Sequence, residues 1–195
     1  MELSGSKSLQ NLMRAFSGET QAWARYAFAE SAARTQGFPI LGELFHYTAQ
    51  QEKEHAEVLW HLLQGAGVPE ADASGSYPVD VRGDVHSLLT QAVAHEYREA
   101  DTVYPSFAAA AEEEGFAPIA QKLRALAAIE RVHAQRFERI ARLLEQDRLF
   151  REDRPMSWIC LHCGHVVSAA EPPAVCPVCS HEQGGFLRLE LSIFQ

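Results

Sequence analysis

The sequence predicts a mainly α-helical protein: a four-helix bundle over residues 1–148, followed by a small metal-bound β module over residues 158–195. Three observations support this prediction. Residues 1–148 are dominated by Ala, Glu, Leu, Gln and Arg and contain few β-branched residues, which is a helix-forming composition. Four long segments of this region repeat apolar residues at spacings of three and four. All four cysteines lie between residues 160 and 179, as two Cys-x-x-Cys pairs.

Start and stop signals place the predicted helices at residues 6–35, 39–64, 83–114 and 116–147. The first two are separated by "TQGFP", in which Gly37 and Pro39 form the expected stop signal, and the second ends at "GAGVP". The third helix contains Pro105, which removes one helical hydrogen bond and clashes with the preceding turn. We therefore expect a kink or a local break there. Residues 149–157 form the predicted linker to the β module.

The lengths of the connections predict how the helices are arranged. The first pair and the last pair are each joined by a short turn, so each pair forms an antiparallel hairpin. The connection between the hairpins, residues 65–82, is long and rich in Gly, Pro, Ser and Asp. Extended at about 3.3 Å per residue, it can cover the roughly 45 Å length of such a helix. A four-helix bundle with one long crossover has the ferritin-like topology.

Acidic and histidine residues interrupt the apolar stripes at matching positions in the two hairpins. The interval from Glu19 to Glu52 differs by only one position from the interval between Glu96 and Glu130. Glu52 and Glu130 each begin a Glu-x-x-His motif. In an antiparallel hairpin such residues fall at the same depth, so the bundle would bring them to one level of its core. The set is Glu19, Glu52, His55, Glu96, Glu99, Glu130 and His133.

Such a cluster requires cations. Each buried charge costs several kcal/mol, and like charges add to the cost. Carboxylates bridge hard cations and imidazole suits iron. A Glu from each of two helices and a Glu-x-x-His from each of the other two is the pattern of di-iron and di-manganese carboxylate proteins. A single Glu-x-x-His usually lies on a solvated helix face, but two at matching spacings favour a metal site. We expect Glu112, Glu113 and Glu114 to form a solvated run at a helix end.

The cysteine spacing predicts a second metal site. Four thiolates arranged as two Cys-x-x-Cys pairs bind a tetrahedral metal, either zinc or a single iron. Zinc would make the module a structural ribbon, whereas iron would make it a one-electron carrier. A redox-active site in the same chain favours iron, because it gains from a nearby electron donor. We expect His162 and His165 to stay outside the ligand shell. The predicted ligands are Cys160, Cys163, Cys176 and Cys179.

Charge and hydropathy exclude several classes of function. The formal net charge is -9, which argues against nucleic-acid binding, because such proteins usually carry a basic patch. No apolar run is long enough to span a membrane, and no apolar segment lies near the N-terminus. We therefore expect a soluble cytoplasmic protein. The chain lacks a dinucleotide-binding fingerprint, so electrons from NAD(P)H would have to come through a separate reductase.

The sequence resembles the rubrerythrin family across nearly its whole length. The resemblance rests on the motifs "FSGETQAWARY", "QQEKEHAEVL", "HEYREADTVYPSF", "IERVHAQRF" and "CLHCGHVV…CPVCSH", in that order. It implies a ferritin-like di-iron bundle followed by a rubredoxin-like domain with one iron held by four thiolates. It also implies reduction of hydrogen peroxide to water in protection against oxidative stress, with an external reductase or a rubredoxin as electron donor. The family is typically homodimeric, with the rubredoxin-like domain of one subunit close to the di-iron site of the other.

Carried over residue by residue, the resemblance assigns roles within the cluster. Glu52 and Glu130 would bridge the two irons. His55 and Glu99 would alternate as ligands when the iron changes oxidation state. The implied ligands are Glu19, Glu52, Glu96, Glu99, Glu130 and His133, with His55 redox-dependent and Tyr26 and Tyr104 close to the site.

Two other functions remain open from the sequence. A ferritin-like ferroxidase or iron-handling protein would use the same bundle, although Glu99 and the cysteine module argue against it. A non-catalytic zinc-ribbon interaction protein would carry a colourless four-cysteine site. The sequence departs from the commoner family residues at His165, Ala94 and Arg98, and these departures leave the predicted ligands intact.

Overall fold

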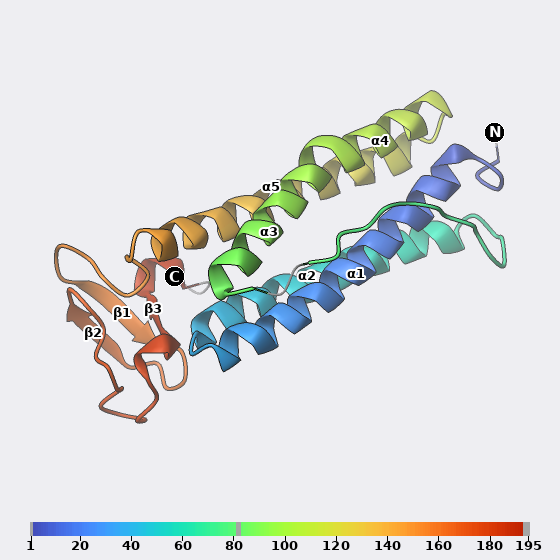
Figure 1. Ribbon diagram of the computed structural model, residues 1–195. Coiled ribbons are helices and arrows are strands. Elements are labelled where there is room, and N and C mark those ends of the chain that lie inside the picture. The colour runs from blue at the N-terminus through green and yellow to red at the C-terminus, as the bar shows by residue number, and fades with distance from the viewer. Residues whose placement is uncertain (1, 81–82, 193–195) are drawn as a thin grey trace.

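The computed structural model describes residues 2–80 and 83–192. It shows a bundle of long helices with a small three-stranded sheet at one end (Figure 1). No helix in the described ranges is both long enough and apolar enough to cross a membrane. The predicted combination of a helical bundle and a small C-terminal β module is confirmed.

The first hairpin consists of α1 (Lys7–Thr35) and α2 (Pro39–Gln64), within one residue of the predicted bounds. The side chain of Ser6 caps α1 by accepting a hydrogen bond of 3.0 Å from the backbone N–H of Leu9. Gly37 supplies the tight turn between the helices, because its φ of +83° favours glycine. Pro39 then begins α2, where its missing N–H costs nothing.

A second cap on α1 comes from the other hairpin. The carboxylate of Glu114 accepts hydrogen bonds from the backbone N–H groups of Lys7 and Ser8, at 2.9 and 2.8 Å. These N–H groups have no partner inside the helix, and the helix dipole favours a negative charge beside them. The expectation that Glu112, Glu113 and Glu114 all face solvent is therefore wrong for Glu114.

The second hairpin contains an interruption in its first helix. It consists of α3 (Val85–Arg98), a π-helical segment (Glu99–Val103), α4 (Tyr104–Glu113) and α5 (Ala117–Glu145). The backbone N–H of Tyr104 bonds to the carbonyl of Glu99, five residues back. The break expected near Pro105 is confirmed, but it takes the form of a π-helical turn just before the proline.

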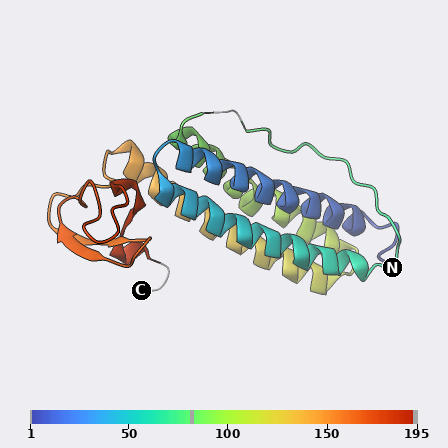
Figure 2. The ribbon, with the colours of Figure 1, turned by 90° about the horizontal axis from the view of Figure 1, so that it is seen from below.

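The crossover runs along the bundle from the end of α2 to the start of α3, beside α1 (Figure 2). Its described part is attached at two points. The hydroxyl of Tyr77 donates to the backbone carbonyl of Arg14 at 3.1 Å. The carboxylate of Asp80 lies 3.3 Å from Nε of Arg25 and 3.4 Å from Nδ1 of His95. The long crossover of the predicted topology is confirmed.

The bundle core has two apolar layers. One cluster of buried side chains includes Phe45 and Phe137, and the other includes Leu12, Leu59 and Leu123. Along α1, α2 and α5 the predicted metal ligands fall between these two clusters. The core is therefore a polar layer enclosed by apolar packing on both sides.

The C-terminal module is an antiparallel sheet of β1 (Met156–Cys160), β2 (Val166–Ala169) and β3 (Phe186–Arg188), in the order β2-β1-β3. It packs against the turn between α1 and α2, where a Cβ on Gly184 would lie 2.4 Å from the carbonyl oxygen of Gly37. The buried guanidinium of Arg188 donates to the carbonyl of Arg151 at 3.1 Å. The predicted linker, residues 149–157, is thus tied to the sheet, and β1 begins inside it.

Removing the cap from the second hairpin tests its contribution to stability. We expect Glu114→Ala to lower the free energy of unfolding by about 1–2 kcal/mol, because two backbone N–H groups lose a charged acceptor. Urea unfolding followed by circular dichroism measures this change. The matched control is Glu113→Ala, which removes an exposed neighbouring carboxylate. Equal losses in both variants would show that the contact contributes nothing.

Candidate metal centres

Six of the predicted ligands meet in the polar layer as two overlapping groups. Within each group, one ligand atom from every residue lies within 4.8 Å of all the others. The first group consists of Glu19, Glu52, His55 and Glu130. The second group consists of Glu52, Glu96, Glu130 and His133. Glu52 and Glu130 belong to both groups. A carboxylate that bridges two metals must be shared in this way.

The two histidines occupy equivalent positions. Nδ1 of His55 lies 3.0 Å from Glu130 and 3.3 Å from Glu52. Nδ1 of His133 lies 2.8 Å from Glu52 and 3.0 Å from Glu130. The two rings are almost parallel, with centroids 5.5 Å apart and an interplanar angle of 12°. The site therefore has an approximate twofold symmetry that relates one hairpin to the other.

Two buried tyrosines hold the carboxylates that the groups do not share. The hydroxyl of Tyr26 on α1 donates to Glu96 on α3, and the hydroxyl of Tyr104 on α4 donates to Glu19 on α1. Burial, together with the adjacent carboxylates, raises the pKa of both tyrosines, so both stay protonated and remain donors. Such contacts fix the orientation of a ligand.

The polar atoms of this layer fit a pair of bound cations. Buried polar atoms without a hydrogen-bond partner are rare and cost about 1–3 kcal/mol each. Here many are left without one, and they point at each other. They are Glu19 Oε2, both carboxylate oxygens of Glu52 and of Glu130, Glu96 Oε2, His55 Nδ1 and both ring nitrogens of His133. Oxygen-rich sets with one imidazole each suit iron or manganese.

Protons stabilise this layer when no metal is bound. Burial, reinforced by Glu52, raises the pKa of Glu96 to about 8. Burial lowers the pKa of His133, but Glu130 and Glu52 outweigh it and raise that pKa to about 11. For Glu52, burial raises the pKa, yet His133 and His55 hold it below its usual value. Metal binding must therefore displace protons from the imidazoles.

Glu99 belongs to neither group. It begins the π-helical segment, is half-buried, and lines a cavity of about 60 Å³ with Gly18 and Tyr77. Burial, followed by the nearby Glu96, raises the pKa of Glu99. In this structure His55 completes the first group and Glu99 lies outside it. The predicted exchange between the two ligands stays a prediction.

The four cysteines form the second centre. The Sγ atoms of Cys160 and Cys179 are 3.6 Å apart, and those of Cys163 and Cys176 are 3.7 Å apart. A disulfide requires about 2.05 Å. A metal bound tetrahedrally at about 2.3 Å from each sulfur would separate the sulfurs by about 3.8 Å. All four sulfurs lie within 4.8 Å of one another, so the set fits one tetrahedral metal.

The two cysteine loops have the same backbone design. Gly164 in the first loop has a φ of +76° and Ser180 in the second has a φ of +61°. Burial raises the pKa of Cys176, but the backbone N–H groups of Cys179 and Val178 outweigh it and lower that pKa to about 6. At Cys176 these backbone donors favour the thiolate, the form that binds metal.

The histidines beside the cysteines form a separate contact. The ring of His162 stacks on that of His181, with centroids 3.6 Å apart. Neither His162 nor His165 belongs to the group of sulfurs. The expectation that they lie outside the ligand set stays a prediction.

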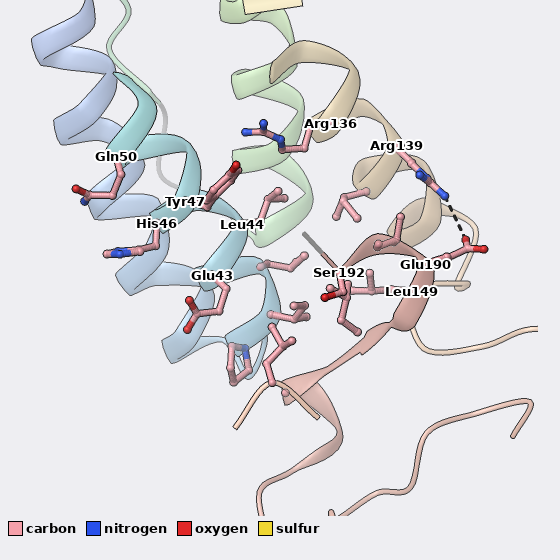
Figure 3. Close-up of a pocket in the computed structure, with 18 of the residues that line it drawn as sticks. Glu43, Leu44, His46, Tyr47, Gln50, Arg136, Arg139, Leu149, Glu190 and Ser192 are labelled. Atoms are coloured by element: carbon pink, nitrogen blue, oxygen red, sulfur yellow. Dashed lines mark hydrogen bonds and ion pairs between the residues drawn. The ribbon is translucent and has the colours of Figure 1, made fainter. Parts of the chain in front are cut away.

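A large cavity lies outside the carboxylate layer and borders the first cysteine loop at Leu161 and His162. It has a volume of about 850 Å³ and lies between α2, α5 and the C-terminal module (Figure 3). Tyr47 and Arg136 line one part of it, and an ion pair of 3.2 Å between Arg139 and Glu190 crosses its edge. Its lining contains none of the predicted metal ligands, so it marks the junction of bundle and module.

Fold and sites together define a ferritin-like bundle with a di-metal carboxylate centre, joined to a rubredoxin-like module with four cysteines. Residues 10–147 match the rubrerythrin family, and residues 158–186 match the rubredoxin-like domain of rubrerythrin. The chain belongs to the rubrerythrin family. The predicted family, the fold class and the two kinds of metal centre, a di-iron carboxylate site and a four-cysteine site, are confirmed.

Similar proteins cover nearly the whole chain. Rubrerythrin of Clostridium perfringens is 38% identical over 185 residues, which are 94% of this chain and 95% of that protein. Rubrerythrin of Porphyromonas gingivalis is 38% identical over 94% of this chain and 90% of that protein. Fully reduced, all-ferrous nigerythrin has a TM-score of 0.64 at 26% identity and covers 95% of this chain and 91% of its own. The bacterioferritin of Desulfovibrio desulfuricans, at 18% identity and a TM-score of 0.64, covers 73% of this chain and 82% of its own and supports the fold alone.

Sequence reasoning missed the residues that the crossover brings to the site. The sequence pattern gives His95 no special role, whereas in the structure its ring lies 3.4 Å from Asp80 of the crossover. Tyr77 covers the cavity next to Glu99 and was not singled out. The path of the crossover decides these contacts, and no periodic pattern in residues 65–82 indicates it.

The raised pKa values predict how the metal-free bundle responds to pH. The folded state holds protons on Glu96 and His133 that the unfolded chain releases, at ordinary pKa values of 4.5 and 6.5. Stability should therefore fall as the pH rises from 6.5 to 8, by about 3 kcal/mol, because both groups act with the same sign there and each contributes roughly half. Urea unfolding of the metal-free protein measures the decline.

Glu96→Gln is the matched variant, because it keeps the shape of the side chain and removes one of the two titrating groups. Its decline over the same pH range should be shallower. A flat profile for the wild type, or equal slopes for both proteins, would contradict the assignment.

Proposed function

We propose that this protein is a non-haem di-iron peroxidase that reduces hydrogen peroxide to water in the cytoplasm and protects against oxidative stress. One observation carries the proposal: two equivalent ligand groups share Glu52 and Glu130, in a chain that also holds a four-thiolate centre. The reaction takes two electrons and two protons for each peroxide and yields two water molecules. Two metal positions match a two-electron step. A thiolate centre with one metal matches the return of electrons to the di-iron pair one at a time.

The choice of iron follows from this electron count. Iron in the two groups would supply the electrons that break the O–O bond. Iron at the cysteines would then transfer electrons to the oxidised pair and so reduce it again. Zinc at the cysteines would satisfy the same geometry but could not change its oxidation state. Glu52 and Glu130 would hold the two metal positions at a fixed separation, and pairs of metals can orient a substrate between them.

Residues of the site can supply the protons. The hydroxyl of Tyr104 donates a hydrogen bond to Glu19, and the hydroxyl of Tyr26 donates one to Glu96. Glu99 faces the cavity beside the first group, and burial raises the pKa of its carboxyl group. A protonated carboxyl at this position is a suitable general acid for a leaving oxygen.

We further propose that Glu99 and His55 exchange as ligands. His55 completes the first group in the present geometry, whereas Glu99 stands at the start of the π-helical segment. Such a turn strains regular helical hydrogen bonding and often marks functional positions. An exchange between an imidazole and a carboxylate would match the ligand to the softer ferrous or the harder ferric state.

The position of the cysteine module supports a homodimer. The module packs on the turn that includes Gly37, at the start of α2. Glu52 lies thirteen residues after Pro39, which corresponds to about 20 Å along the helix. Electron tunnelling rates fall exponentially with distance, so transfer within one chain would be slow. We propose that the module serves the di-iron site of a second subunit and receives electrons from a separate reductase or rubredoxin.

Rapid mixing tests the peroxidase function against the ferroxidase alternative. In the fully reduced, iron-loaded protein, we expect hydrogen peroxide to oxidise the di-iron pair at least about tenfold faster than oxygen at equal concentration. Stopped-flow absorbance measures both rates. Faster oxidation by oxygen would favour a ferroxidase.

Blocking the relay tests the role of the cysteine module. We expect Cys160→Ser to reduce steady-state turnover with a reductase at least about tenfold, while chemically reduced protein still reacts once with peroxide at a rate within about threefold of the wild type. Zinc loaded at the four cysteines should have the same effect without altering the fold. Ser168→Ala, an exposed change in the same module, is the control. Undiminished turnover with zinc in place would rule out this relay.

A further inference from the structure

We propose that Tyr77 and Gly18 restrict the substrate to hydrogen peroxide and exclude branched or aromatic organic hydroperoxides. This inference rests on the peroxidase function proposed above and adds the substrate class and the residues that select it. Its basis is the small cavity between the metal layer and the crossover. Neither residue is a predicted metal ligand, so the selection is a matter of shape.

The cavity is small and opens directly onto the site. Its volume is about 60 Å³, and its inner wall includes Glu19, Glu99 and Tyr104. A single water needs about 10–15 Å³ of such space, and an engineered cavity of roughly 150 Å³ binds benzene. Hydrogen peroxide, with two heavy atoms, fits in this volume. A tert-butyl or cumyl group is much bulkier, and we expect the cavity to exclude it.

Tyr77 forms the outer wall and is held firmly. Its hydroxyl donates to the carbonyl of Arg14 at 3.1 Å. Its ring lies against Gly75, where a Cβ would be only 3.3 Å from the ring. Three residues later, the carboxylate of Asp80 is attached to Arg25 at 3.3 Å. The ring is thus held at its hydroxyl and packs against Gly75, and the chain that follows it is held by the ion pair of Asp80.

Gly18 keeps the cavity open on the α1 side. A Cβ at this position would lie 3.9 Å from Glu99 Oε1 and 3.9 Å from Cε1 of Tyr77. These are ordinary contact distances, so alanine fits without strain but occupies space between the ring and the carboxylate. Glycine inside a helix costs about 0.5–1 kcal/mol relative to alanine. The space that this glycine leaves open beside Glu99 explains why a residue that destabilises the helix occupies this position.

Organic hydroperoxides test size independently of redox chemistry. tert-Butyl hydroperoxide takes two electrons and two protons at its O–O bond and yields tert-butanol and water. The bond that breaks is the same type as in hydrogen peroxide. A difference between the two substrates that depends on Tyr77 therefore reports access to the site.

The experiment compares both oxidants in the reduced, iron-loaded, full-length protein by stopped flow. We expect Tyr77→Ala to raise the rate with tert-butyl hydroperoxide at least about tenfold and to change the rate with hydrogen peroxide less than about threefold. The matched control is Tyr47→Ala, which removes a tyrosine that lines the other cavity. It should leave both rates unchanged. An unchanged ratio of rates in Tyr77→Ala would overturn the inference.

Binding of azide to the oxidised, iron-loaded protein gives a readout that does not depend on turnover. We expect Gly18→Ala to slow azide association at least about fivefold and Tyr77→Ala to accelerate it. Association rates equal to that of the wild type in both variants would also overturn the inference. If the wild type reacts no faster with hydrogen peroxide than with oxygen, the peroxidase function itself fails, and the azide rates still decide whether this is the route to the metals.

Discussion

The structure depends on enclosing a layer of carboxylates and imidazoles between two apolar cores. Glu52, Glu130 and His133 are fully buried, and many of their polar atoms lack hydrogen-bond partners. In water these groups would be well solvated, so the fold must replace that solvation with cations or with protons. The apolar layers on either side supply the burial free energy and keep water away. Folding and metal binding are therefore linked: a bound metal stabilises the folded chain because the unfolded chain has no comparable site.

One extra residue accounts for the asymmetry between the hairpins. The interval from Glu96 to Glu130 is longer by one position than the interval from Glu19 to Glu52. Likewise, Tyr104 follows Glu96 by one position more than Tyr26 follows Glu19. The π-helical segment Glu99–Val103 lies within both of the longer intervals. Because a π-turn takes up one more residue than an α-turn, it restores the register and lets Tyr104 meet Glu19 as Tyr26 meets Glu96.

The periodic part of the sequence was sufficient to predict the helices, the hairpins and the ligands that converge in the core. Side chains three or four residues apart share a helix face, so Glu52 and His55 could be placed together without a structure. The contacts made by loops could not be predicted in this way. Glu114 caps α1 across the bundle, and Tyr77 covers the site from the crossover, at sequence separations of 106 and 63 residues. Nothing in the local pattern specifies such partners.

The crossover also gives the two long faces of the bundle different roles. It runs beside α1 (Figure 2). The cavity at Glu99 is lined by residues of α1, α3, α4 and the crossover. The carboxylates shared by both groups come instead from α2 and α5. Substrate would therefore approach from the face that the crossover covers, where the wall can select by size. In the proposed homodimer, the face formed by α2 and α5 would be the one left for the partner's cysteine module, so electrons and peroxide would reach the same two metals from opposite sides without competing for space.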